Sequence, residues 1–73
     1  MPETIRLVIE GKVQGVFYRQ SAKEKASIIG ITGTVRNLPD GNVEIIATGT
    51  SEQLQQLTQW CNQGPQRAVV TKV

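Results

Sequence analysis

The stretch from Gly11 to Arg19 holds the residue types in this sequence that are best suited to chemistry. It contains two glycines, Gly11 and Gly15, and it ends on an arginine. An alternating apolar run precedes it and a helix-like run follows it, which predicts a strand-to-helix connection. In such a connection, backbone N–H groups, the positive end of a helix and a guanidinium can converge on one point. The stretch therefore predicts an anion site, with phosphate as the commonest ligand.

Asn37, at the end of a second predicted strand, is the other candidate for chemistry. Its amide could orient a water molecule for in-line attack without acting as a strong base. If the leaving group is already good, as the carboxylate of an acyl phosphate is, positioning and charge stabilisation dominate phosphoryl transfer. The planar guanidinium of Arg19 is suited to hold two phosphoryl oxygens. The residues alone leave open the simpler interpretation of a glycine-rich loop, an exposed arginine and a turn asparagine.

Two other patterns imitate known sites. Residues 61–67 spell C-x-x-G-x-x-R, the loop of cysteine-dependent phosphatases. Cys61, however, falls at the C-terminal, negative end of a predicted helix, where a thiolate is disfavoured, so we expect a small buried hydrophobe. Residues 28–33 imitate the G-x-x-G loop of KH RNA-binding domains, but they lack a basic residue and strand-like sequence follows them. A helix end followed by a strand start is the favoured interpretation there.

Six elements are predicted around these residues from apolar periodicity and turn signals. In chain order they are a strand at 4–11, a helix ending near 29, strands at 32–37 and 42–48, a helix from 50 that stops at Gly64, and a strand near 68–73. Two helix starts are typical of capping boxes, Ser21 with Glu24 and Thr50 with Gln53. The first helix can begin earlier if an anion serves as its cap.

This order predicts an α+β, ferredoxin-like βαββαβ fold, in which a four-stranded antiparallel sheet carries both helices on one face. Residues 1–73 are expected to form a single domain. In that fold the first and second strands run the same way, so the loop after the first and the end of the second emerge at one edge. We therefore expect Arg19 and Asn37 to be neighbours in space.

The composition excludes several classes of function. With no histidine and one cysteine in 73 residues, the chain lacks an internal disulfide, the usual zinc ligands and the usual general base. A net charge of +2 is far below that of a dedicated duplex-DNA binder. The sequence shows no signal peptide, long apolar run or lipidation signal, so we expect a cytoplasmic protein without a nucleic-acid or membrane partner.

Residues 11–19, G-K-V-Q-G-V-F-Y-R, resemble the acylphosphatase signature G-x-V-Q-G-V-x-[FY]-R. Residues 30–41 are similar to the family's second segment, G-x-x-G-x-V-x-N-x-x-D-G, and Gly49 and Gly64-Pro65 also match. The resemblance covers nearly the whole chain. Family members usually carry a further segment that ends in an edge strand beside the second strand, whereas this sequence stops at Val73. The strand at 32–37 is therefore expected at an edge of the sheet.

The resemblance implies hydrolysis of an acyl phosphate to a carboxylate and inorganic phosphate, without a metal or cofactor. Arg19 resembles the family's phosphate-binding arginine, and Asn37 resembles the asparagine that positions the nucleophilic water. The backbone amides that cradle the phosphate would come from Gln14, Gly15, Val16, Phe17 and Tyr18. The implied partners are a small-molecule acyl phosphate and inorganic phosphate as product, and a monomer is expected. The competing hypothesis is a non-catalytic acylphosphatase-like module that binds an anion or a partner.

Overall fold

The computed structural model describes residues 2–73, which fold in the predicted order of strand, helix, strand, strand, helix, strand. The elements are β1 (Glu3–Lys12), α1 (Tyr18–Ile29), β2 (Thr32–Asn37), β3 (Val43–Gly49), α2 (Ser51–Gln63) and β4 (Val69–Lys72). The predicted strand bounds agree with these to within about a residue at each end. No helix within residues 2–73 is long and apolar enough to cross a membrane.

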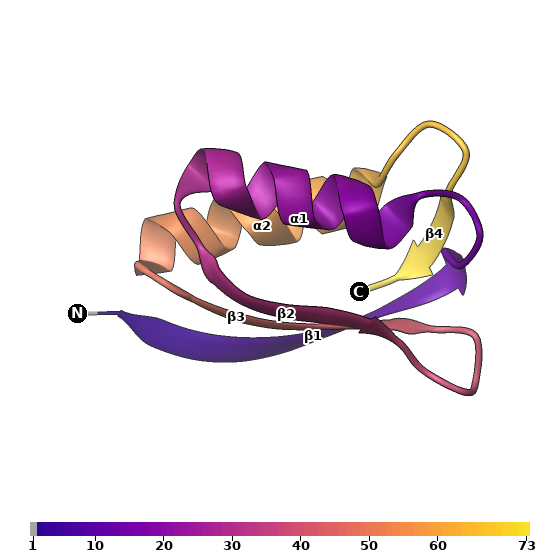
Figure 1. Cartoon of the computed structure of the whole chain (residues 1–73), viewed down its shortest axis with the longest axis horizontal. Coiled ribbons are helices and arrows are strands. Elements are labelled where there is room, and N and C mark those ends of the chain that lie inside the picture. The colour runs from indigo at the N-terminus through magenta and orange to yellow at the C-terminus, as the bar shows by residue number, and fades with distance from the viewer. Residues whose placement is uncertain (1) are drawn as a thin grey trace.

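The four strands form one sheet in the order β2-β3-β1-β4, with antiparallel neighbours throughout. Both helices lie on the same face of this sheet (Figure 1), which confirms the predicted ferredoxin-like arrangement. Because β1 and β2 are each antiparallel to β3, they run in the same direction. The chain after β1 and the chain after β2 therefore emerge at the same end of the sheet.

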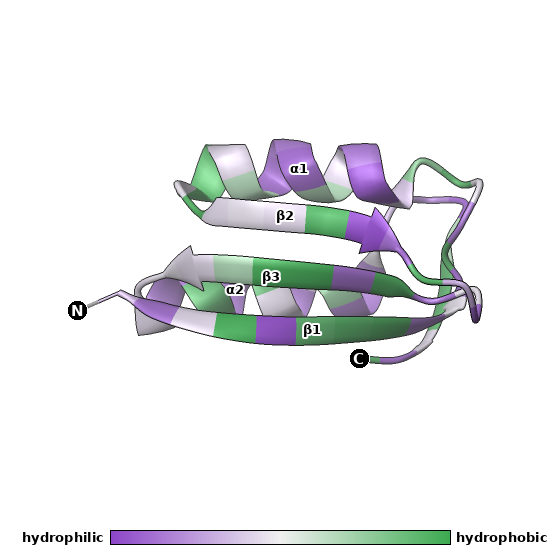
Figure 2. Ribbon diagram, turned by 60° about the horizontal axis from the view of Figure 1, so that its bottom comes forward, coloured by the Kyte–Doolittle hydropathy of each residue, from purple (hydrophilic) through white to green (hydrophobic). Residues whose placement is uncertain are grey.

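The core lies between the sheet and the helices, where the alternating strand residues face the helical stripes. Ile9 and Val43 are fully buried, and Ile5 and Leu7 pack against the same cluster. From the helices, the buried residues are Tyr18, Ala22, Leu54, Leu57 and Cys61. Figure 2 shows the apolar residues of β1 and β3 side by side in the middle of the sheet. Burial of this one face is the main driving force that holds the layers together.

The two helices begin in different ways. Thr50 and Gln53 form the predicted capping box of α2, in which each side chain accepts a hydrogen bond from the other residue's backbone N–H. The capping box predicted at Ser21 and Glu24 is wrong, because α1 starts earlier, at Tyr18. The N–H of Ser21 is already used in the first helical hydrogen bond, to the carbonyl of Phe17 at 3.0 Å. Phe17 is the N-cap, and its side chain makes no capping hydrogen bond.

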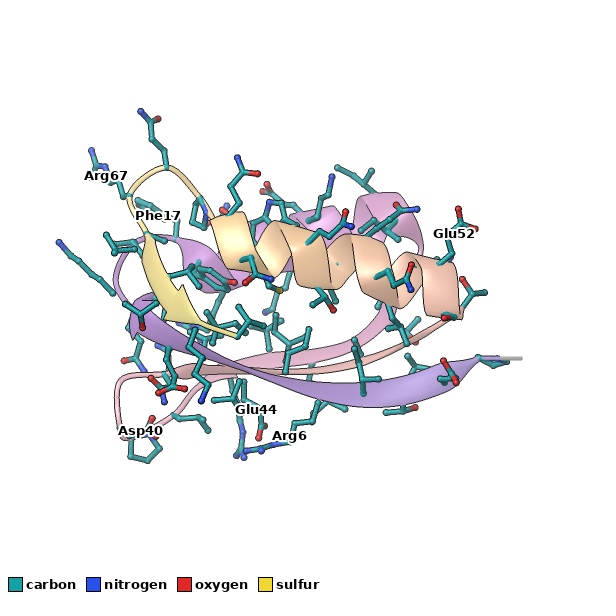
Figure 3. The ribbon with its side chains drawn as sticks, turned by 180° about the vertical axis from the view of Figure 1, so that it is seen from behind. Arg6, Phe17, Asp40, Glu44, Glu52 and Arg67 are labelled. Carbon is teal, nitrogen blue, oxygen red and sulfur yellow. The ribbon has the colours of Figure 1, made fainter. Side chains whose placement is uncertain are left out.

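The face of the sheet away from the helices carries a charged clamp, which we define as Arg6, Glu44 and Arg36. The Glu44 carboxylate accepts a hydrogen bond from Nε of each arginine at 2.7 Å. Arg6 belongs to β1, Glu44 to β3 and Arg36 to β2, so the clamp spans three adjacent strands. Figure 3 shows Arg6 and Glu44 projecting from the side of the sheet opposite the helices.

Candidate active site

The loop between β1 and α1 is fixed by two buried valines and turned by two residues with positive φ. Val13 and Val16 are 1% and 6% exposed and belong to the core. Gly15 has a φ of 72°, and a Cβ there would meet nothing within 4 Å. A glycine is therefore favoured at this position by the backbone conformation and not by crowding. Phe17 adopts the same left-handed region, with a φ of 63°, although it carries a side chain.

This conformation leaves a row of backbone donors at the start of α1. Within residues 2–73, the N–H groups of residues 15–20 donate no hydrogen bond to a protein acceptor, and the first helical bond comes from Ser21. No acidic residue lies in the first turn of α1. Unpaired N–H groups and the positive end of the helix dipole together favour an anion. The loop therefore has features that suit an anion, and the phosphate site that the sequence predicted stays a prediction.

Tyr18 anchors the helix start to the rest of the molecule. Its hydroxyl donates to the carbonyl oxygen of Cys61 at 2.8 Å, and its ring lies 5.4 Å from that of Trp60, tilted by 50°. A Cβ on Gly64 would lie only 2.9 Å from the Tyr18 ring, so the close approach requires glycine there. Burial raises the pKa of Tyr18, which keeps its hydroxyl protonated as a donor. The side chain of the next residue, Arg19, therefore extends from a backbone position that Tyr18 fixes. Arg19 itself is exposed.

Arg19 and Asn37 meet in one pocket, as their place in the topology predicts. The pocket has a volume of about 260 Å³, and its lining residues are Val13, Gly15, Phe17, Tyr18, Arg19, Gln20 and Asn37. Val13 and Gln20 were not among the residues singled out from the sequence. Val13 lies within the stretch from Gly11 to Arg19 and Gln20 directly follows it, so their position in the chain was the available signal. Arg19, Asn37 and several loop residues whose N–H groups are free thus line one space, which is large enough for a phosphoryl group.

Gln14 has a role that the sequence did not indicate. Its side-chain Nε2 donates to the carbonyl oxygens of Leu38 at 2.8 Å and Asn42 at 2.9 Å. The side chain is therefore directed at the turn after β2, and Gln14 is not among the residues that line the pocket. The role assigned to the backbone amides of residues 14–18 stays a prediction.

The two competing patterns are accounted for by packing. Cys61 is fully buried at the C-terminal end of α2, and burial raises its pKa to about 11. A buried neutral thiol is a poor nucleophile, so the interpretation of Cys61 as a core residue is confirmed. Gly30 ends α1, where its N–H bonds to the carbonyl of Ala26, and β2 begins at Thr32. The G-x-x-G segment is therefore a helix end followed by a strand, also as expected.

The described residues contain no group of three or more Cys, Asp and Glu side chains placed to hold a metal ion. The polar groups that line the pocket are a guanidinium and amides, which are donors or neutral ligands and do not make a hard-cation site.

Comparison with known proteins adds a second line of evidence. The family model "Acylphosphatase" matches residues 5–73. An acylphosphatase from Marinobacter nauticus is 58% identical over 67 residues, which are 92% of this chain and 73% of that protein. An acylphosphatase from Acaryochloris marina is 53% identical over an alignment of 75 positions, which covers 100% of this chain and 81% of the relative.

Solved structures agree with these relatives. An acylphosphatase from Coxiella burnetii superposes with a TM-score of 0.93 at 41% sequence identity, over 97% of this chain and 75% of that one. An acylphosphatase from Bacillus subtilis superposes with a TM-score of 0.92 at 33% identity, over 99% of this chain and 79% of that one. Together with the matching fold, these similarities show that the chain belongs to the acylphosphatase family.

Proposed function

We propose that this protein hydrolyses acyl phosphates to a carboxylate and inorganic phosphate. Arg19 and the 14–19 loop hold the phosphoryl group, and Asn37 positions the attacking water. The observation that carries the proposal is one pocket that is lined by Arg19, by Asn37 and by loop residues whose N–H groups are free. Membership of the family supports the same reaction.

The chemistry asks little of the protein beyond geometry and positive charge. The water oxygen bonds to phosphorus as the bond from phosphorus to the acyl oxygen breaks, and the proton from the water leaves with the phosphate product. The carboxylate is a stable leaving group, so no general acid is needed to protonate it. The guanidinium and the loop amides stabilise the phosphoryl oxygens, while the Asn37 amide holds the water in line.

Hydrolysis of benzoyl phosphate by the purified chain tests the proposal. We expect turnover in the wild type, and a loss of about a hundredfold or more in kcat for Asn37→Ala because the water is no longer aligned. Inhibition by inorganic phosphate should persist in that variant. Arg19→Ala should weaken phosphate inhibition by about 10- to 100-fold, the value of a charge-assisted hydrogen bond.

The outcomes separate this function from its competitor. A folded wild-type chain that binds phosphate but hydrolyses nothing would be the non-catalytic anion-binding module. Full activity in Asn37→Ala would contradict the water-positioning role while leaving the reaction intact.

The setting of the reaction is part of the same proposal. Residues 1–73 act as one domain and as a monomer, and the reaction takes place in the cytoplasm. The continuous core beneath both helices supports a single folding unit. Light scattering of the purified chain at several concentrations tests whether it is a monomer.

A further inference from the structure

We propose that Gln14 is a positioning residue that holds Asn37 in register with the phosphate loop. Its side chain acts through the turn that follows Asn37 and does not itself touch the substrate, whereas its backbone amide belongs to the proposed 14–19 loop. The inference rests on the proposed function, because its effect on turnover requires Asn37 to align the attacking water.

The two halves of the site come from strands that are not neighbours. The proposed phosphate loop, residues 14–19, follows β1, and Asn37 ends β2. In the sheet, β3 lies between β1 and β2. At this end, Val43 of β3 is opposite both Asn37 and Ile9. No backbone ladder therefore joins the loop directly to Asn37. Within residues 2–73 β2 pairs only with β3, so these backbone pairs hold the end of β2 to β3 and not to the loop after β1.

The Gln14 side chain crosses this gap. Its two N–H groups reach Leu38, the residue directly after Asn37, and Asn42, the residue directly before β3. Both acceptors are carbonyl oxygens, so the amide must present its nitrogen to them. The contacts span 24 and 28 positions in the chain. In Figure 1 the turn between β2 and β3 and the loop between β1 and α1 lie at the same end of the molecule.

The turn closes without help from Gln14. The N–H of Leu38 donates to the carbonyl of Asn42 at 2.8 Å, and the N–H of Gly41 donates to the carbonyl of Leu38 at 3.2 Å. The Asp40 carboxylate accepts a further bond from the N–H of Asn42 at 3.0 Å. Removal of the Gln14 amide therefore leaves each carbonyl with another donor. What it removes is the attachment of the turn to the loop.

The backbone at Gln14 is itself fixed, so its side chain can hold the turn after β2 in one place. It follows Val13, which is 1% exposed, and its own side chain is half-buried. The amide thus extends from a backbone that the core fixes. A shift of about 1 Å at a positioning residue can cost about a hundredfold in rate, so a tether at this point affects turnover more than stability.

The test compares Gln14→Met with the wild type in benzoyl phosphate hydrolysis. Methionine keeps the length of the side chain and removes both donors. We expect kcat to fall by about 10- to 100-fold, while the inhibition constant for inorganic phosphate changes by less than about threefold, because Arg19 and the loop amides remain in place.

Gln53→Met is the matched control. Gln53 also joins two elements through its amide, by donating to the carbonyl of Ile29 at 3.1 Å and accepting from the N–H of Thr50 at 2.8 Å. It lies at the start of α2, at the end of the molecule opposite the site (Figure 1). The same substitution there should lower the melting temperature and leave kcat at its wild-type value, which separates positioning from general loss of stability.

Gln14→Glu adds a second readout, the pH dependence of kcat, which a merely structural role of Gln14 would not change. This variant also replaces Gln14→Met as the test if Gln14→Met does not fold. The introduced carboxylate has no donor and repels the two carbonyls, whereas its protonated form can donate to one of them. The ratio of variant to wild-type kcat should therefore rise as the pH falls from 7 towards about 4.3, the ordinary pKa of a glutamate.

The outcomes are distinct. Wild-type turnover with a normal kcat in Gln14→Met, or a flat pH ratio in Gln14→Glu, would overturn this inference alone. A parallel loss of kcat and phosphate affinity would overturn it too, since Gln14 would then shape the loop and not the turn. A folded but inactive wild type would overturn the proposed function and the inference with it.

Discussion

Phe17 shows what single residues contribute to the site. It is 66% exposed and sits in the left-handed region at the start of α1. A non-glycine residue there costs about 1–2 kcal/mol relative to the right-handed region. Phe17 is the N-cap of α1, so the chain enters the helix through this conformation, beside the pocket that Phe17, Tyr18 and Arg19 help to line. Strain of this kind gathers at binding sites, where the surrounding fold maintains it.

A pair of substitutions isolates this cost. Phe17→Gly and Phe17→Ala remove the same exposed ring, but only glycine adopts the left-handed region freely. We expect the glycine variant to be more stable than the alanine variant by roughly 1 kcal/mol in the free energy of unfolding, after allowing for the flexibility of unfolded glycine. Urea denaturation of both variants measures the difference.

The same pair at Glu24 is the control, because this residue is exposed in the interior of α1. Alanine should be the more stable there, by about 1 kcal/mol. If alanine were also the better residue at position 17, the left-handed conformation would not be a source of strain.

The sequence predicted which two side chains lie together at the candidate site, but not the backbone conformation and the side-chain contacts around them. Arg19 and Asn37 could be paired because strand direction follows from element order. The left-handed conformation of Phe17 could not be predicted, because nothing in its residue type favours it. The side-chain contacts of Gln14 were equally hidden, since they depend on how a turn 24 or more residues away is placed.

At the scale of elements, the charged clamp joins three strands on the open face of the sheet. The side chain of Glu44 is 7% exposed, whereas those of Arg6 and Arg36 are 58% and 67% exposed. The hydrogen bond from Arg36 and then that from Arg6 lower the pKa of the Glu44 carboxyl below its usual value. The clamp ties β2, which carries Asn37, to the centre of the sheet.

The clamp predicts how stability depends on pH. Because the pKa of Glu44 is lowered in the folded state, its contribution is present above the unfolded pKa of about 4.3 and is lost as the pH falls through the folded value. Glu44→Gln should therefore lower the free energy of unfolding most at neutral pH, and the gap to the wild type should narrow in acid.

Urea midpoints between pH 7 and pH 3 measure this gap. Arg36→Gln removes the first of the two donors, so the urea midpoint of this variant should fall less steeply between pH 7 and pH 3 than that of the wild type. If the midpoints of the wild type and Glu44→Gln changed with pH in parallel, the clamp would not lower the pKa of the Glu44 carboxyl.

At the scale of the whole molecule, binding and folding are linked. An anion that binds the folded loop and not the unfolded chain adds RT ln(1 + [L]/Kd) to the free energy of unfolding. At ten times its Kd, inorganic phosphate should add about 1.4 kcal/mol, which raises the melting temperature of a domain this small by roughly 5–10 °C. Calorimetry over a phosphate series measures the shift.

Arg19→Ala provides the reference for that measurement. Phosphate also stabilises proteins in general, through its exclusion from their surfaces. The variant retains this general effect and should lose most of the specific one. Equal shifts in the two proteins would mean that the loop does not bind phosphate.

The architecture could be predicted more fully than the site. Alternation in the strands and the capping box of α2 are local patterns, and the order of elements leaves few ways to pack them. The start of α1 was placed too late because Ser21 and Glu24 imitate a capping box. The observed start of α1 depends on the loop before it, which Val13 and Val16 fix by packing into the core. Long-range packing of that kind leaves no local pattern in the sequence.

The anchoring of Tyr18 on Trp60 also makes the protein its own optical probe. The chain has one tyrosine and one tryptophan, and their rings lie 5.4 Å apart. At that distance, light absorbed by tyrosine is emitted by tryptophan, so the native protein should show almost no tyrosine emission. Tyr18 begins α1 beside Arg19, whereas Trp60 belongs to α2. The emission spectrum of the unlabelled chain therefore reports whether the start of α1 is docked against the second helix.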